Sequence, residues 1–443
     1  MSNDTRNNLC SLACCVVVAA TAFLTMVSPS HAAVEDASAA AGSKHGGHLL
    51  KDYRELETYI SSAQSRVMSL QHPDQVQLTA ARQPILGGMQ ALAAVQSFMG
   101  QPIEAVKTFD GEERLWNDWI EKPKVIGDRE KDIRAIQSAH AVDALDAIVA
   151  SAQHRQIVIL NEAHHVSYHR LFAGQLAKRL RSLGFTYLAC ETFEGTSTEI
   201  LSDGYVSQRT GHYSEEPTFA GFLTDAIRDG WKFTSYEPDP NDGEREFAMA
   251  RNIERRILEK DPNARIFIYV GYSHGQKFPA STSDSDGRRF AAQLKRQSGI
   301  DPLTIDQTVL FDHYSSDQQS NYYALALKKL RSPDPAVLVR PNGSNFSFSA
   351  PEMSYDFEVV YPRYGISQKT QRPQWLDAWL SAGRTARDIP PNLLSNNATR
   401  VIYAYRANSP KDAVPYDVVT VRPGEPVPKM ILPAGDYDFE YEE

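Results

Sequence analysis

The sequence is poor in cysteine. Three of its four cysteines, Cys10, Cys14 and Cys15, fall within one apolar segment near the N-terminus, and only Cys190 lies in the rest of the chain. A single cysteine excludes a disulfide framework there, so that part must rely on an apolar core for its stability. Because Cys190 ends the apolar run that begins at Tyr187, we predict that it packs as a small hydrophobic residue.

The chain also lacks an excess of positive charge. Its formal net charge is −9 and its isoelectric point is about 5.8. Binding of polyphosphate requires a basic surface, so we do not expect nucleic acid as a partner. The partner that we expect is instead a small-molecule or peptide substrate.

Only one long apolar run is present. It extends from Leu9 to Val27, after a polar stretch that contains Arg6, and the small residues Ala32 and Ala33 follow it closely. This order is typical of a secretory signal peptide cleaved near Ala33, so we expect an exported protein, periplasmic or secreted. Contact with a membrane is expected only if the segment stays uncleaved, since about 19 apolar residues suffice for an anchor.

What remains has the composition of a globular protein, with 42% hydrophobic and 23% charged residues. Apolar residues at helical spacing predict helices between Leu49 and Met99, and again from Ala135 to Ala152. Beyond residue 335, short runs at 357–361, 400–405, 417–422 and 437–441 favour strands, and the first of them is expected to extend the main sheet. We therefore divide the chain into a signal peptide (1–33), a flexible linker (34–48), an N-terminal helical region (49–134), an α/β domain (135–395) and a C-terminal β accessory region (396–443).

The α/β domain is predicted from strands that alternate with helices. Apolar runs at 157–161, 186–189, 231–236 and 266–270 have no polar alternation, which is typical of strands buried on both faces. Helical patterns separate these runs, which favours right-handed crossovers. The predicted fold class is α/β, with a largely parallel central sheet flanked by helices, an N-terminal helical layer and a small C-terminal β unit.

Polar side chains follow each of these runs. The carboxyl ends of parallel strands form a crevice where ligands bind, so these side chains are expected to share one site. Asn241 and Glu244 resemble a capping box that opens a helix from Arg245 to Leu258. Arg245 lies in its first turn and either faces the crevice or pairs with Glu244 or Glu246 on the surface. The strand ends carry Glu162, His164, His165, Glu191, Glu237 and His274.

Together these motifs resemble a known superfamily. It joins the erythromycin esterases, Tiki-type proteases, TraB-type proteins and ChaN-like haem-uptake proteins, and the resemblance covers roughly residues 135–380. The family's first motif usually begins with glycine, whereas Asn161 holds that position here. The matching residues are Asn161-Glu-Ala-His164-His165, Glu191, Arg245-Glu-x-x-Met249-Ala250-x-Asn252-Ile253, Gly271-x-x-His274, Tyr355-Asp356 and Arg372-Pro-x-Trp375-Leu376.

Hydrolysis of an ester or amide is the chemistry that these residue types favour. Without a metal, His164 acts as general base, Glu162 or Glu191 orients its imidazole, and Arg245 stabilises an oxyanion. With a metal, a Zn or Mn ion held by His164, His274 and Glu191 lowers the pKa of a bound water. The remaining candidates for binding substrate or metal are His165 and Glu237, together with His274, and His165 with His169 forms a further possible metal pair.

Two other interpretations stay open. The resemblance to ChaN-like proteins implies haem binding without hydrolysis as an alternative, although Tyr403 and Tyr405 alternate as β-sheet residues do. Gly271-Tyr-Ser273-His-Gly275 also matches the nucleophile elbow of serine hydrolases. Such an elbow turns directly into a helix, whereas Pro279 and a Ser/Asp-rich stretch follow here, and His313 is the sole later histidine for a triad.

Overall fold

The computed structural model describes residues 44–119, 127–194, 201–277, 288–316, 318–350 and 355–443. The predicted signal peptide (1–33) lies outside these residues. Among the helices of this part of the chain, none combines the length and the apolar character needed to cross a bilayer. The helices are α2 (Leu49–Ser69), α3 (Gln75–Phe98), α4 (Pro102–Trp119), α5 (Arg129–Ser138), α6 (Ala144–Ala152), α7 (Ser167–Ser182), α8 (Pro217–Arg228), α9 (Arg245–Ile253), α10 (Phe290–Ser298), α11 (Asn321–Leu327) and α12 (Asp377–Ser381).

An eight-stranded sheet forms the centre of the fold, in the order β1-β7-β8-β6-β2-β5-β3-β4. The strands from β8 to β4 in this order run parallel, and β7 and β1 add an antiparallel edge. This confirms the predicted α/β class with a largely parallel sheet. The strands are β1 (His140–Asp143), β2 (Ile157–Glu162), β3 (Tyr187–Cys190), β4 (Lys232–Thr234), β5 (Ile266–Gly271), β6 (Leu303–Asp306), β7 (Ala336–Val339) and β8 (Phe357–Val360).

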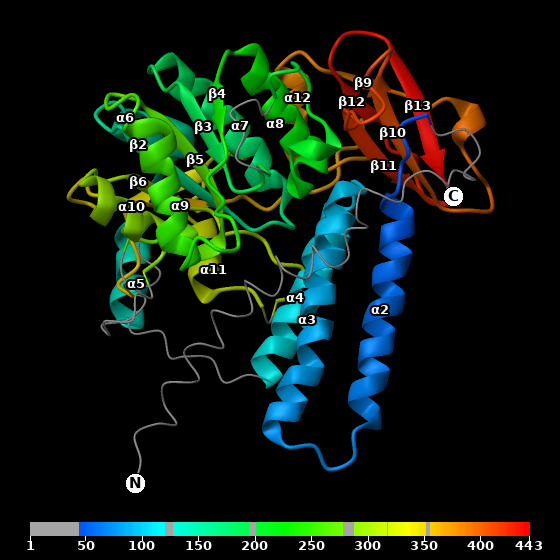
Figure 1. Cartoon of the computed structure of the whole chain (residues 1–443), viewed down its shortest axis with the longest axis horizontal. Helices are drawn as coiled ribbons and strands as arrows, with labels where there is room; N and C mark the ends of the chain where they lie inside the picture. Colours follow the sequence, from blue (N-terminus) through cyan, green and yellow to red (C-terminus); the bar gives the residue numbers. More distant parts are fainter. Residues whose placement is uncertain (1–43, 120–126, 195–200, 278–287, 317, 351–354) are drawn as a thin grey trace.

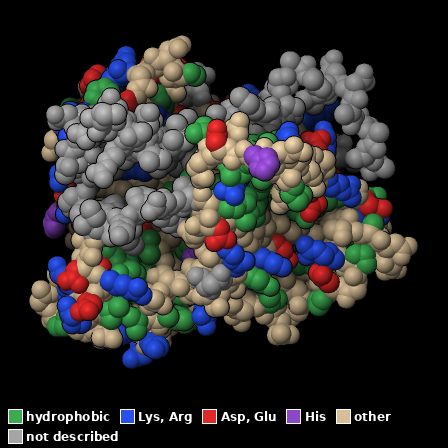
Figure 2. Space-filling model, turned by 90° about the horizontal axis from the view of Figure 1, so that it is seen from below, with side chains coloured by type: hydrophobic (Ala, Val, Ile, Leu, Met, Phe, Trp, Pro, Cys, Tyr) green, Lys and Arg blue, Asp and Glu red, His purple; other side chains and the backbone are tan. Residues whose placement is uncertain are grey.

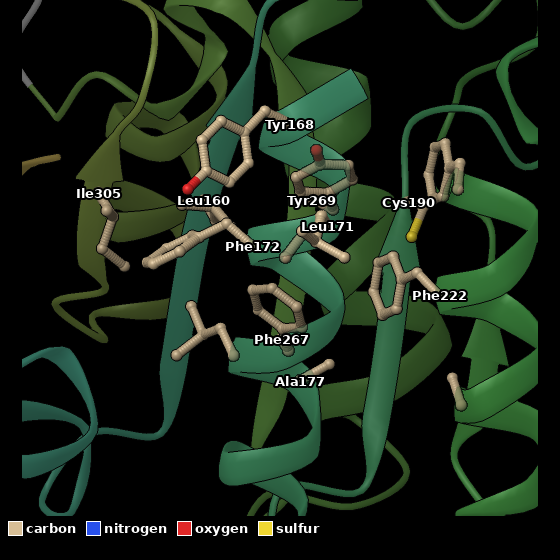
Figure 3. Packing of buried hydrophobic residues seen from close by; sticks show 14 of the residues in the cluster. Leu160, Tyr168, Leu171, Phe172, Ala177, Cys190, Phe222, Phe267, Tyr269 and Ile305 are labelled. Atoms are coloured by element: carbon tan, nitrogen blue, oxygen red, sulfur yellow. The ribbon is translucent and has the colours of Figure 1, made fainter. Parts of the chain in front are cut away.

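Helices cover both faces of the sheet. Alternate residues of β2 and β5 point to opposite sides, so Leu160 and Phe267 pack with α7 and α8, while Ile159 and Ile268 pack with α9 and α10. Figure 3 shows the first of these layers, where the aromatic and aliphatic side chains of α7 face those of the strands. Cys190 lies within this layer, free and fully buried, which confirms its predicted packing role.

The N-terminal helices and the C-terminal strands pack together. Figure 1 shows α2 and α3 as long helices that extend away from the α/β body and meet the C-terminal strands at one end. Side chains of α2 and α3 form one apolar cluster with Val401, Tyr403 and Tyr405. The C-terminal strands are β9 (Thr385–Arg387), β10 (Arg400–Arg406), β11 (Asp417–Val421), β12 (Met430–Leu432) and β13 (Tyr437–Glu442); β11-β10-β13 and β12-β9 form two small antiparallel sheets.

Ion pairs and hydrogen bonds reinforce this contact. His45 is buried, pairs with Glu440 of β13 at 2.7 Å and stacks on Tyr405. The predicted flexible linker therefore does not extend to the residues just before α2. On the α/β side, Arg372 makes a buried two-pronged salt bridge to Asp417 of β11, with N–O distances of 3.0 and 3.1 Å. The C-terminal unit is thus joined to both neighbours.

Two local predictions were wrong. The single helix expected from residues 135 to 152 is interrupted by β1, because residues 140–143 pair with β7 as the edge strand of the sheet and Asp143 then caps α6. Tertiary pairing has overridden the helical pattern. The expected capping box of Asn241 and Glu244 is also absent, since Glu244 is itself the N-cap of α9 and accepts from the N–H groups of Glu246 and Phe247.

Charged side chains of both signs are interspersed on the face shown in Figure 2.

The structure confirms the four strands expected beyond residue 335. They are β8, β10, β11 and β13, at the positions expected at 357–361, 400–405, 417–422 and 437–441, and the first of them extends the main sheet. Tyr403 and Tyr405 are buried in β10, as expected of sheet residues.

Candidate active site

Four neighbouring strands deliver the polar side chains that the sequence singled out. In the sheet, β2, β5, β3 and β4 lie side by side, so residues that follow them meet at one carboxyl edge. Glu162 ends β2, Glu191 directly follows β3, and His274 lies three residues beyond β5. The structure therefore brings together side chains that are up to 112 residues apart in sequence, from Glu162 to His274.

The first element of the site is a histidine–carboxylate pair. Nδ1 of His164 lies 2.8 Å from Glu162, which leaves Nε2 as the outward-facing ring nitrogen. Arg170 of α7 donates to both oxygens of Glu162 at 2.9 and 3.0 Å, and the hydroxyl of Tyr269 donates to it at 2.7 Å. Glu162 is thus held from several sides, and it fixes the orientation of the His164 ring.

An aromatic ring covers one face of His164. Tyr213 stacks on it with ring centroids 4.0 Å apart. Gly211, two residues earlier, has φ +136°, and a Cβ there would lie 1.6 Å from the carbonyl oxygen of Thr192. Only glycine permits this close approach, by which the loop after β3 folds back. The hydroxyl of Thr192 then accepts the N–H of Tyr213 at 3.0 Å, which places the ring.

A second histidine–carboxylate pair lies across the site. Nδ1 of His274 lies 2.9 and 3.0 Å from the two oxygens of Glu246, on the first turn of α9. Glu246 also accepts the backbone N–H of Phe290 at 2.6 Å and lies 3.3 Å from Arg289. As with His164, Nδ1 is engaged by a carboxylate while Nε2 faces the other site residues.

Arg245 connects the remaining carboxylates. Its guanidinium donates to Glu191 at 2.7 Å, to Glu237 at 2.8 and 3.0 Å, and lies 3.1 Å from Nε2 of His274. Of the two orientations that the sequence allowed for Arg245, the structure has the one toward the crevice. The side chains of His164, Arg245 and Glu237 are 17%, 20% and 26% exposed, so a ligand can reach them, whereas Glu162 and His274 are 4% exposed.

Gly271 shows how closely these groups approach. The backbone N–H of Gly271 donates to Glu191. A Cβ at this residue would lie 2.6 Å from Nε2 of His164 and 2.9 Å from Oε2 of Glu191. The His164 ring and the Glu191 carboxylate therefore occupy the space that a side chain of residue 271 would fill, and the absence of a side chain allows them to converge.

Local charges determine the ionisation of the carboxylates. Burial raises the pKa of Glu162, but the charge of Arg170 and the bond to His164 outweigh it and lower the pKa well below the usual value. Burial acts in the same way on Glu191, where His274 and Arg245 nevertheless lower the pKa. Both carboxylates are therefore ionised at neutral pH and favour a positive charge beside them.

His274 has a raised pKa. Burial alone would lower it, but the negative charges of Glu246 and Glu191 outweigh burial. In the neutral form Nε2 accepts from Arg245 at 3.1 Å, and in the protonated form it faces the oxygen of Glu191 at 3.6 Å. Nε2 of His274 therefore has a partner in both protonation states.

These donors do not fit a bound metal ion. Of the ligands considered from the sequence, His164, His274 and Glu191, the latter two contact the guanidinium of Arg245, which already supplies the positive charge and occupies Nε2 of His274. In the described ranges, no group of three His, Cys, Asp or Glu side chains is arranged to hold a metal.

Two candidate histidines are placed elsewhere. His165 is buried and stacks on Phe109 of α4 at 3.9 Å, and neither of its ring nitrogens has a hydrogen-bond partner. Burial lowers its pKa well below the usual value. His169 accepts the N–H of Ala163 within the same layer. His165 thus joins α4 to the α/β body, whereas the ring of His169 packs on Phe311 and Tyr361.

The serine arrangement is not formed. Ser273 lies in a short 3-10 turn (Tyr272–Gly275), and α10 begins only at Phe290. His313, the later histidine, pairs with Asp110 of α4 at 2.6 Å. Within the part of the chain that the structure describes, no hydrogen bond joins a histidine to the Ser273 hydroxyl.

Several residues of the site were missed in the sequence. Glu246 had been considered only as a surface partner of Arg245, and Arg170, Tyr213 and Tyr269 were not singled out. The order of the strands and the path of the loop after β3 bring these residues to the site. Neither feature has a local signal in the sequence. The loop from residue 193 to 218 supplies Tyr213, and its residues 195–200 lie outside the described residues.

Comparison with known proteins adds little. No family model matches the chain, and no curated protein matches it either. Among solved structures, that of the type III effector HopBA1 is similar over 55% of this chain and 99% of its own length, with 14% identity and a TM-score of 0.31. The crystal structure of RRSP, a MARTX toxin effector domain from Vibrio vulnificus CMCP6, is similar over 52% of this chain and 58% of its own, with 15% identity and a TM-score of 0.20. These likenesses are too weak to bear on function.

Proposed function

We propose that this protein is an exported hydrolase that cleaves an ester or amide with a water molecule activated by His164. The proposal rests mainly on one observation: Nε2 of His164 and the carboxylate of Glu191 converge over Gly271. Each of the two is fixed by an oppositely charged or hydrogen-bonding partner, His164 by Glu162 and Glu191 by Arg245. Such a preorganised group of base, cation and carboxylates is the arrangement that general-base catalysis requires.

The base is the His164 imidazole. Because its Nδ1 is engaged by the ionised Glu162, Nε2 carries the free electron pair. It removes a proton from water as the water oxygen bonds to the substrate carbonyl carbon, and the electron pair of the C=O bond moves onto its oxygen. Glu162 stabilises the imidazolium that forms, since it is charged, buried and fixed by Arg170.

Arg245 and His274 serve the other half of the reaction. Arg245 is partly exposed and supplies a positive charge for the oxyanion, while Glu191 and Glu237 hold its guanidinium in place. When the intermediate collapses, the C–O or C–N bond breaks and the leaving group takes a proton. The His164 imidazolium donates the proton that it took from water, which restores the neutral base, while Nε2 of His274 helps to hold the Arg245 guanidinium in place.

Comparison of His164→Ala with Ser273→Ala tests the proposal. Purified wild type and both variants are assayed against a panel of aryl esters and peptide amides. The H164A variant is expected to lose at least about a hundredfold in kcat/KM, the usual contribution of a general base, while S273A retains activity. Equal losses in the two variants would favour the serine mechanism, and wild-type inactivity across the whole panel would count against hydrolysis of these substrates.

A change in folding must be separated from a change in chemistry. His154 is exposed and distant from the site, so His154→Ala is a matched control for the loss of an imidazole. Thermal unfolding of all three variants is expected to lie close to that of the wild type, because His164 is partly exposed and its partner Glu162 keeps the bonds from Arg170 and Tyr269.

A further inference from the structure

The turn after β5 contains an unusual backbone conformation. Tyr272 has φ +42°, in the left-handed region that residues with a side chain rarely adopt. It is the first residue of the 3-10 turn that carries His274. A conformation of this kind persists only when its surroundings hold it in place.

The side chain of Asn161 stabilises this conformation of Tyr272. Its side-chain N–H donates to the carbonyl oxygen of Tyr272 at 2.8 Å, and the hydroxyl of Tyr355 donates to the same oxygen at 3.3 Å. Asn161 is fully buried at the end of β2, and its side-chain oxygen Oδ1 accepts the backbone N–H of Gln307 at 2.8 Å. The amide is thereby fixed with its N–H group toward the turn, an orientation that the hydrogen-bond partners determine.

Tyr272 touches both halves of the site. Its ring lies edge-on to the ring of His164, with centroids 5.0 Å apart and an interplanar angle of 86°. Two residues further on, His274 makes its bonds to Glu246 and Arg245. A shift of the Tyr272 backbone would therefore move His274 and would also alter the packing on His164.

We propose that Asn161 is a positioning residue of this site, which holds the Tyr272 backbone and thereby sets the place of His274. The role in catalysis rests on the proposed hydrolysis, whereas the hold on the turn does not. The residue type matters, because alanine has no N–H to donate, and aspartate would present an acceptor to the Tyr272 carbonyl and a second negative charge to Asp306, which lies 2.5 Å from the Asn161 amide.

A double-mutant cycle tests the hold on the turn. The variants are N161A, Y272N and the double variant, because asparagine is the residue other than glycine that adopts left-handed φ most readily. In N161A, the lost hydrogen bond should loosen the turn and raise the rate of His274 carbethoxylation about fivefold. In the Y272N background, the added N161A change should alter this rate less than about twofold. Asparagine at residue 272 adopts the left-handed φ more readily than tyrosine, so this conformation depends less on the hydrogen bond from Asn161.

The measurement uses the intact protein without substrate. Diethylpyrocarbonate is the probe, peptide mass spectrometry gives the rate at His274, and the exposed His154 is the internal reference. Equal rate changes in the Tyr272 and Y272N backgrounds would overturn the proposal, because Asn161 would then act through the buried network alone. If N161A does not fold, Y355F removes the second donor to the same carbonyl, and an unchanged His274 rate there would also overturn it.

Hydrolytic activity is measured in a separate experiment. If the wild type hydrolyses a substrate, N161A should lower kcat/KM about a hundredfold, the cost of displacing a catalytic group by about 1 Å, and less in the Y272N background. A failure of hydrolysis with the carbethoxylation pattern intact would reject the proposed function and leave the role of Asn161 in the turn.

Discussion

A methyl group at residue 271 provides a direct test of the site geometry. Gly271 has φ −85° and ψ 143°, an extended conformation that alanine adopts without strain. The Cβ of Gly271→Ala would nevertheless lie 2.6 Å from Cε1 and Nε2 of His164 and 2.9 Å from Oε2 of Glu191. Carbon atoms prefer separations of about 3.5 Å or more, so the His164 ring must move by roughly 1 Å.

The expected loss follows from that displacement. Overpacking of this kind costs about 1–3 kcal/mol of stability, and a misplacement of about 1 Å costs on the order of a hundredfold in rate. We expect both effects in G271A, measured as kcat/KM and as the urea unfolding midpoint. Gly87→Ala in α3 is the matched control, since its Cβ meets nothing within 4 Å. Full activity and unchanged stability in G271A would refute the convergence of His164 and Glu191.

Three further predictions concern charge and burial. In Glu246→Gln the pKa of His274 should fall, because one of the two negative charges that raise it is lost; an NMR titration of the imidazole measures the shift, and an unchanged pKa would exclude the contact between His274 and Glu246. Arg372→Ala leaves Asp417 charged and buried, which should cost about 3–5 kcal/mol in urea unfolding, and a loss below about 1 kcal/mol would show that the pair is not buried in solution. The Cys190 thiol should not react with Ellman's reagent until the protein is denatured, because burial raises its pKa; rapid reaction of the folded protein would contradict the packing in Figure 3.

The sheet and its polar edge could be predicted because their signals are local. Continuous apolar runs such as 157–160 and 266–270 mark strands buried on both faces, and the residues that follow such strands share an edge whatever their order. Glu162, His164, Glu191, Glu237 and His274 were found in this way, and all lie at that edge.

The partners of these residues could not be predicted, because they depend on contacts between distant elements. Glu246 appeared to be an ordinary surface acid beside Arg245, and only the approach of the turn after β5 makes it the partner of His274. His165 shows the opposite error. Its position next to His164 suggested a ligand, but the side chain of His165 points away from that of His164 and is covered by Phe109 of α4.

The contact of α2 and α3 with the C-terminal strands has a consequence for the order of folding. Their apolar cluster includes Tyr403 and Val418, and Leu50 donates its N–H to Glu442 across 392 residues of sequence. The helical layer therefore lacks part of its core until the last strands have been synthesised, and contacts of such long range form slowly. Phe109 of α4, in the same layer, stacks on Tyr272, whose ring lies edge-on to His164. This side of the site should therefore be completed late, so that a nascent chain carries the residues for catalysis before it carries the enclosure around them.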